Sequence, residues 1–455
     1  MLRYDLTRLP FLKTLLRSRW PQFLLSVIAL LGFLLAILSG LVGSPVGSRN
    51  FGIIFVWIAW WAILMLVAVP FFGRGWCSIC PIPLPGEWLQ RGALLKPGEK
   101  GGLGLGRRWP NRWRNIWLQN GSFALVALFS AVILTQPRAT GIVLAAFLFV
   151  AVGTSLIFER RAFCRYLCPV GGFIGLYSQA APVEVRVKDS AVCAAHTEKT
   201  CYTGSAEGFG CPWQVYPAGL VKNTYCGTCM ECLRTCPQDN IAINLRLPGT
   251  DLAVERGRKL DEAYKAFIML GSALIYAAVL LGPWGSLKAA AFQVGTLSWL
   301  GYALAFVLVV FGLLPGLFYL AVLAGKHLSG DRLQNRRAFI SYSYALIPLG
   351  LAAWIAFSLA FVFTNLSYIG PAISDPFGWG WNLMGAADQS WTPYLTQALP
   401  ALQIVVLLGG LIWTTVVARR IATQQSSTSR TDLQALPVAT FACAITLSML
   451  GLLIG

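Results

Sequence analysis

Four cysteines near the middle of the chain have the spacing of iron–sulfur ligands. They lie in the motif Cys226-Gly-Thr-Cys229-Met-Glu-Cys232-Leu-Arg-Thr-Cys236-Pro. Three thiolates at positions i, i+3 and i+6 can bind three corners of a [4Fe–4S] cluster, while a fourth Cys followed by Pro serves a neighbouring cluster. Zinc sites instead use two separated Cys-x2-Cys pairs. The motif therefore predicts iron–sulfur chemistry rather than a zinc site.

A second group of cysteines lies upstream and has the form of a stretched half of the same motif. It consists of Cys193, Cys201 and Cys211, the last of which is followed by Pro. If the halves exchange ligands as in two-cluster ferredoxins, Cys211 completes the first [4Fe–4S] cluster. Cys193, Cys201 and Cys236 then hold three corners of a second cluster.

A fourth ligand of this second cluster is unaccounted for. His196 is the nearest candidate, because it follows Cys193 by three residues and imidazole can replace thiolate at iron. A solvent-exposed or packed histidine is the alternative interpretation. In that case the second site is a three-cysteine cluster or is absent.

Two shorter motifs each supply a pair of cysteines at the end of a hydrophobic run. Cys77 and Cys80 follow one run, Cys164 and Cys168 follow another, and Pro comes directly after the second cysteine of each pair. Four thiolates gathered at one depth need a metal or disulfides to offset their charge. We expect a third metal site at the membrane boundary, occupied by an iron–sulfur cluster. A redox-active thiol pair is the alternative.

The elements that position these cysteines are membrane helices. The composition is 56% hydrophobic and only 12% charged, and about 20 apolar helical residues suffice to cross a bilayer. Nine charge-free stretches are long enough: residues 21–48, 50–73, 115–137, 139–158, 266–287, 289–325, 338–374, 389–418 and 433–455. The sequence predicts about nine transmembrane helices.

Basic residues predict how these helices are oriented. The chain has 36 Lys and Arg against 18 Asp and Glu, and basic residues accumulate in cytoplasmic loops. With the N-terminus inside, all basic residues except Arg49, Arg138 and Lys288 fall on the cytoplasmic side. We expect a multi-pass protein of the cell inner (cytoplasmic) membrane with its clusters on the cytoplasmic side. The positive charge then reflects topology and contact with membrane lipid, not nucleic-acid binding.

Three segments follow from this organisation. Residues 1–158 form a four-helix transmembrane part with the first Cys-Pro motif, residues 159–262 a cytoplasmic segment with the second Cys-Pro motif and the ferredoxin-like cysteines, and residues 263–455 a five-helix transmembrane part. The predicted fold class is therefore an α-helical polytopic membrane protein with an inserted cytoplasmic ferredoxin-like iron–sulfur segment. We expect no haem, because His196 and His327 both lie outside the spans.

The sequence from Phe163 through Cys168-Pro-Val-Gly-Gly, followed by the Cys226 motif and flanked by membrane helices, resembles the membrane polyferredoxins typified by NapH and NosR. The copper-handling CcoG group is similar more distantly. The resemblance covers roughly residues 50 to 250. It implies a membrane iron–sulfur protein that passes electrons between the quinone pool and redox partners, with these cysteines as cluster ligands.

Three functions are compatible with parts of this sequence. We expect an electron-transfer subunit that relays electrons between quinone and partner subunits. It would be an oxidoreductase component of a larger complex. A metal-reducing assembly or maturation factor of the CcoG type is the alternative, although six Met and two His form no copper-binding cluster. A transporter would require charged residues in the later spans, and the expected spans have none.

Overall fold

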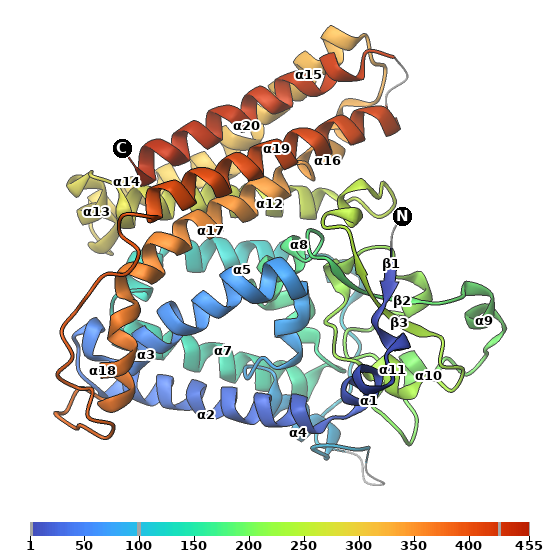
Figure 1. Ribbon diagram of the computed structural model, residues 1–455, viewed down its shortest axis with the longest axis horizontal. Helices are drawn as coiled ribbons and strands as arrows, with labels where there is room; N and C mark the ends of the chain where they lie inside the picture. Colours follow the sequence, from blue (N-terminus) through green and yellow to red (C-terminus); the bar gives the residue numbers. More distant parts are fainter. Residues whose placement is uncertain (1–2, 98–101, 426–428, 455) are drawn as a thin grey trace. The chain divides into compact units, whose positions relative to one another are not determined.

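The computed structural model describes residues 3–97, 102–425 and 429–454 and is mainly helical (Figure 1). Among these residues, eight helices are long and apolar enough to cross a membrane. Their bounds are Trp20–Val42 (α2), Phe51–Ser78, Pro137–Ile157 (α7), Leu260–Leu281, Leu297–Ser329, Asn335–Ser374, Leu399–Gln425 (α19) and Thr431–Leu453 (α20). The predicted class, an α-helical polytopic membrane protein, is confirmed.

The stretch 115–137, expected as a further span, is not one continuous helix. It forms α5 (Trp117–Leu128) and the short helix α6 (Ser130–Ile133). Between them, Phe129 leaves helical geometry, and its carbonyl accepts from the amide of Val132, three residues later. The count of nine spans considered only the length of each charge-free stretch, which does not reveal such a break.

The chain divides into two compact units, which are described separately. Unit 1 comprises Met1–Ile37, Val67–Gln119 and Ile142–Val254, and unit 2 comprises Leu38–Leu66, Asn120–Gly141 and Glu255–Gly455. Every cysteine proposed above as a ligand belongs to unit 1. The remaining one, Cys443, lies in α20 of unit 2 and is exposed.

A three-stranded antiparallel sheet in unit 1 frames the ferredoxin-like cysteines. The strands are β1 (Arg3–Asp5), β2 (Val183–Val187) and β3 (Ile241–Arg246), in the order β1-β3-β2. Val185, Leu233, Ile241 and Ile243 form its hydrophobic core. Three short helices lie in the segment between β2 and β3: α9 (Ser190–Ala195), α10 (Thr200–Thr203) and α11 (Glu231–Thr235) (Figure 1).

The N-terminal stretch takes part in this sheet. The basic residues before the first span provide both β1 and the helix α1 (Pro10–Arg17). Arg3 of β1 pairs with Arg246 of β3, and its side chain forms a 2.8 Å ion pair with Glu184 of β2. Glu184 is completely buried, so this first strand fixes a carboxylate in the interior of the sheet.

Unit 2 is a helical bundle in which α12 (Leu260–Tyr276) packs beside α17 (Leu346–Asn365), as Figure 1 shows. The helix α12 begins before residue 266, the expected start of this span. It therefore includes Asp261, Glu262 and Lys265, whose exposed fractions are 4%, 1% and 0%. The expectation that the later spans contain no charged residue is wrong, because these charges face the protein interior, where polar partners such as the Tyr344 hydroxyl meet them.

Candidate iron–sulfur centres

The two Cys-Pro motifs lie at the ends of helical segments in unit 1. Cys77 lies in the last turn of the helix Phe51–Ser78, and Cys80 follows just beyond it. Cys164 lies in a short π-helical turn, a distortion found frequently at functional sites. Cys168 caps the N-terminus of α8 (Pro169–Tyr177), and its Sγ accepts from an α8 backbone amide.

These four thiols lie within electrostatic reach of one another. The neighbouring thiols contribute to the environments of Cys80, Cys164 and Cys168. Burial, followed by the nearby sulfurs, raises the pKa of Cys164 and of Cys80, and burial raises the pKa of Cys168 to about 11. The four thiols lie close enough to interact electrostatically. A bound metal would deprotonate such thiols, and its positive charge would offset the negative charge of the thiolates.

The ferredoxin-like motif surrounds a cavity together with the upstream Cys-Pro. Cys211, Cys226, Cys229 and Cys232 all line this cavity, and the remaining lining is largely apolar. Burial raises the pKa of Cys226 to about 11 and that of Cys229 to about 12. Four thiols around an enclosed apolar space are the donor set that a [4Fe–4S] cluster requires.

The backbone approaches Trp213 very closely at this cavity. A Cβ atom added to Gly227 would lie only 1.8 Å from Nε1 of the Trp213 indole. Trp213 is 1% exposed, and the guanidinium of Arg74 stacks over its ring at 4.1 Å. Packing against Trp213 therefore requires glycine between Cys226 and Thr228.

The remaining cysteines, Cys193, Cys201 and Cys236, form another group. Cys236 and Cys193 are the strongest charged neighbours of Cys201, whose pKa is raised to about 11 mainly by burial. Asn240 connects the other two, because its side chain donates to Sγ of Cys193 at 3.2 Å and its backbone amide donates to Sγ of Cys236 at 3.3 Å. Sequence reasoning did not find Asn240, which lies four residues after Cys236.

His196 is less clearly placed at this group. It ends α9, and its backbone amide donates to the carbonyl of Val192. Among the described residues its imidazole forms no hydrogen bond, and it is not among the charged neighbours of Cys201. Its role as the fourth ligand stays a prediction.

Two arginines are shared by the membrane-boundary thiols and the ferredoxin-like cavity. Arg74 contributes to the electrostatic environments of both Cys168 and Cys226. Arg161 acts on Cys80 at the first site and on Cys229 at the second. Cations in this position lower the cost of adding negative charge to either site. They also indicate that the two sets of thiols are close in space.

Arg161 is held by a buried carboxylate that the sequence did not reveal. Its guanidinium binds Glu87 of α4 (Leu84–Arg91) with contacts of 2.6–3.0 Å and donates to the carbonyl of Cys77 at 2.6 Å. Glu87 is 2% exposed and also pairs with Arg91. Coulombic attraction to these arginines lowers the pKa of Glu87 despite its burial.

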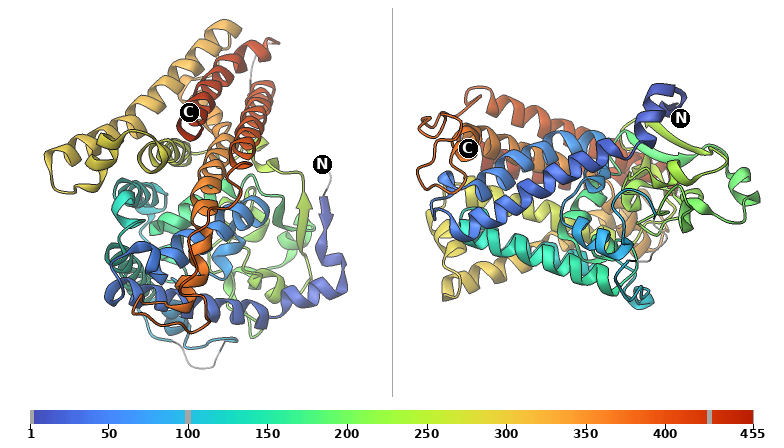
Figure 2. Two further views of the ribbon diagram at one scale, coloured as in Figure 1. Left: turned by 60° about the vertical axis from the view of Figure 1, so that its left-hand side comes forward. Right: turned by 90° about the horizontal axis from the view of Figure 1, so that it is seen from below.

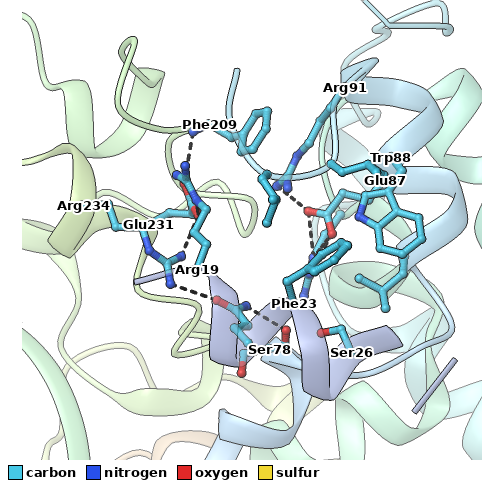
Figure 3. A pocket seen from close by; sticks show the side chains of 15 residues that line it. Arg19, Phe23, Ser26, Ser78, Glu87, Trp88, Arg91, Phe209, Glu231 and Arg234 are labelled. Carbon is cyan, nitrogen blue, oxygen red and sulfur yellow. Dashed lines mark hydrogen bonds and ion pairs between the residues drawn. The ribbon is translucent and has the colours of Figure 1, made fainter. Parts of the chain in front are cut away.

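A second carboxylate, Glu231, mirrors this arrangement across a cavity of about 60 Å³ (Figure 3). Glu231 binds Arg19 and Arg234, at 2.9 and 2.8 Å. Arg234 in turn donates to the carbonyl of Cys229 at 3.0 Å. Each ion pair thus holds an arginine that donates to a cysteine carbonyl: Arg161 to that of Cys77, and Arg234 to that of Cys229.

All twelve cysteines are free of disulfides. Within the part of the chain that the structure describes, no three His, Cys, Asp or Glu side chains converge as they would around a single metal ion.

Comparison with protein families identifies a 4Fe-4S binding domain, which matches residues 53–111 and 140–186. Both Cys-Pro motifs lie within the matched residues, whereas the cysteines from Cys193 to Cys236 lie outside them. The chain is thus a polytopic helical protein that contains a 4Fe-4S binding domain.

Curated relatives are similar over part of their length. The methylamine utilization ferredoxin-type protein MauN of Paracoccus denitrificans is 29% identical over 135 residues, which are 27% of this chain and 44% of that protein. The putative electron transport protein YccM of Escherichia coli is 28% identical over 98 residues, 21% of this chain and 25% of that protein. The chain therefore matches less than half of either relative, and no solved structure matches it.

Proposed function

We propose that this protein relays single electrons through iron–sulfur clusters between membrane quinone and a redox partner, as a subunit of a larger complex. The observation that carries the proposal is the cavity lined by four cysteines beside a second set of four thiols, three of them buried, with Arg74 and Arg161 contributing to the electrostatics of both sets. The similarity to ferredoxin-type and electron transport proteins supports it.

Each set of residues has a separate part in this proposal. Cys211, Cys226, Cys229 and Cys232 would hold one [4Fe–4S] cluster, and such clusters supply one-electron chemistry. The two Cys-Pro motifs would hold another at the membrane boundary, within reach of a lipid-soluble quinone. The third group, Cys193, Cys201 and Cys236, would hold a further cluster, with His196 as the candidate fourth ligand.

We also propose that the clusters lie on the cytoplasmic side of the inner membrane. The distribution of basic residues supports this orientation. Lipid headgroups would then contact the basic loops, and partner subunits would approach the segment between β2 and β3.

The proposal is tested with the full-length protein purified anaerobically in detergent. Reduction by a quinol should produce paramagnetic iron–sulfur signals, and Cys77→Ser should remove one of them while leaving the ferredoxin-like signals in place. Cys443→Ser is the matched control, because this exposed thiol lies in unit 2. Zinc in place of iron and labile sulfide, or clusters that no quinol reduces, would contradict the proposal.

A further inference from the structure

The buried side of α12 carries polar residues along its length. Asp261, Lys265, Ser272 and Tyr276 are spaced by four, seven and four residues, which places them on one face of the helix. Their exposed fractions are 4%, 0%, 0% and 7%. At 1.5 Å per residue this face extends over about 22 Å. Ionisable residues that face the interior of a membrane bundle often mark ion or proton pathways.

The facing surface belongs to α5 and α6 and is also partly polar. Asn120 donates from Nδ2 to the carbonyl of Asp261 at 2.8 Å. Nζ of Lys265 lies 5.2 Å from the centre of the Phe123 ring. At the far end, Ser130 forms a hydrogen bond with the side chain of Tyr276. These contacts bring α5 and α6 to α12 at Asp261, Lys265 and Tyr276.

The Asp261 end of this polar face approaches the surface of unit 2, whereas the Tyr276 end is buried. Beside Asp261, Glu262 accepts a 2.6 Å hydrogen bond from the hydroxyl of Tyr344, which itself accepts from the backbone amide of the exposed Lys259. At the other end, Tyr302 of α14 (Leu297–Val307) belongs to the same buried cluster as Ala131 of α6. The side chain of Tyr302 interacts electrostatically with that of Tyr276.

Three buried polar atoms along this line have no hydrogen-bond partner among the described residues. They are Oδ1 of Asn120, Oγ of Ser272 and the hydroxyl of Tyr302, in side chains that are 1%, 0% and 5% exposed. Buried polar atoms of native proteins are almost always satisfied, by protein or by ordered water. Ordered water between the side chains would satisfy these three atoms.

We propose that unit 2 contains a proton path along the contact between α12 and α5–α6, running from Glu262 and Asp261 past Lys265, Ser272 and Tyr276 to Tyr302, with water between the side chains. A proton taken up at one end is passed on as each oxygen or nitrogen forms one bond to hydrogen and releases another. One proton leaves at the far end, no electron moves, and every group returns to its initial state. The path goes beyond electron transfer and does not depend on any cluster.

Reconstitution of the full-length protein into liposomes tests this path. The vesicles contain a pH-sensitive dye, and valinomycin with a potassium gradient drives protons across the bilayer. We expect proton flux above that of protein-free liposomes. Ser272→Ala and Tyr302→Phe each remove one hydroxyl with little change of shape, and we expect each to lower the flux about tenfold, equivalent to about 1.4 kcal/mol in the barrier.

Ser448→Ala is the matched control, because Ser448 is exposed on α20 and bonds only to its own helix. It should conduct as the unmodified protein does. Two independent variants keep the test informative if one of them does not fold. Flux no greater than that of bare liposomes, in both oxidised and dithionite-reduced protein, would overturn the path. Equal flux in Ser272→Ala, Tyr302→Phe and the control would overturn it too.

Discussion

Cys211 joins two segments of the chain at a single cavity. It precedes the motif that contains Cys226, Cys229 and Cys232, yet all four thiols line the same space. The backbone amide of Val215 donates to its sulfur at 3.5 Å, as expected for a sulfur held ready to carry negative charge. As a ligand from outside the Cys226 motif, Cys211 would tie the stability of the proposed cluster to the fold of the whole segment.

Cys211→Ser should therefore release one cluster. We expect the purified protein to lose about four iron atoms and the same number of labile sulfides per chain. Iron and sulfide assays measure this loss, and Cys443→Ser should retain the full content. An unchanged iron content in Cys211→Ser would show that this cysteine is not a ligand.

Gly227→Ala should disturb the same cluster without removing a ligand. The new Cβ would overlap the indole of Trp213, whose Nε1 lies 1.8 Å away, so the loop or the ring must move. We expect a lower cluster content by absorbance, and partial recovery when Trp213→Leu makes room. Gly219→Ala serves as the control, because nothing lies within 4 Å of its added Cβ. Equal cluster contents in both alanine variants would refute this explanation.

At the scale of elements, the pair Glu87–Arg161 joins α4 to the segment that carries the second Cys-Pro motif. Both side chains are buried, with exposed fractions of 2% and 6%. Removing one partner of a buried ion pair strands the other charge, whereas replacing both with apolar residues is often tolerated. Through Arg161 the pair also holds the carbonyl of Cys77. We therefore expect loss of the pair to disturb the position of Cys77 in the proposed metal site.

Glu87→Leu should lower the free energy of unfolding by about 3–5 kcal/mol, because Arg161 remains buried without its main partner. The double variant with Arg161→Leu should lose less than the sum of the two single variants. Urea titration in detergent, followed by loss of cluster absorbance, measures both effects.

The exposed pair Arg419–Asp432 provides the comparison, with side chains 65% and 67% exposed. Asp432→Leu should scarcely change stability, because exposed ion pairs contribute little. Additive losses in the double variant at positions 87 and 161 would mean that the two residues act independently.

For the molecule as a whole, the basic residues predict which loops face the cytoplasm. The candidate span Asn335–Ser374 contains α17, and Arg336 and Arg337 lie near its start. Reporter fusions after Arg337 and after Asp375 should lie on opposite sides of the membrane, with the first in the cytoplasm. Activity of the same compartment-specific reporter at both positions would overturn the proposed topology.

Much of the helical architecture could be predicted from charge-free length alone. Phe129 and Lys265 are two features that this criterion does not reveal. A one-residue departure from helical geometry at Phe129 changes neither hydropathy nor charge, so the sequence does not reveal it. Lys265 is tolerated inside a span because it is buried against protein, and burial depends on neighbours that are distant in the sequence.

The candidate sites follow the same rule. The spacing of Cys226, Cys229 and Cys232 is local and could be found directly. The supporting residues Glu87 and Asn240 could not, because a single Glu or Asn has no spacing pattern and acquires its role only when the chain brings it to Arg161 or to two sulfurs.

The strand β1 has a consequence for the order of synthesis. Its partner β3 lies about 240 residues further along the chain, and ribosomes add roughly 5–20 residues per second. The first strand therefore waits about 12–50 s after its synthesis, while several helices enter the bilayer, before the sheet can close. Until then the cysteines between β2 and β3 have no complete frame. If this segment holds clusters as proposed, the frame around them is complete only after the ribosome has passed Arg246.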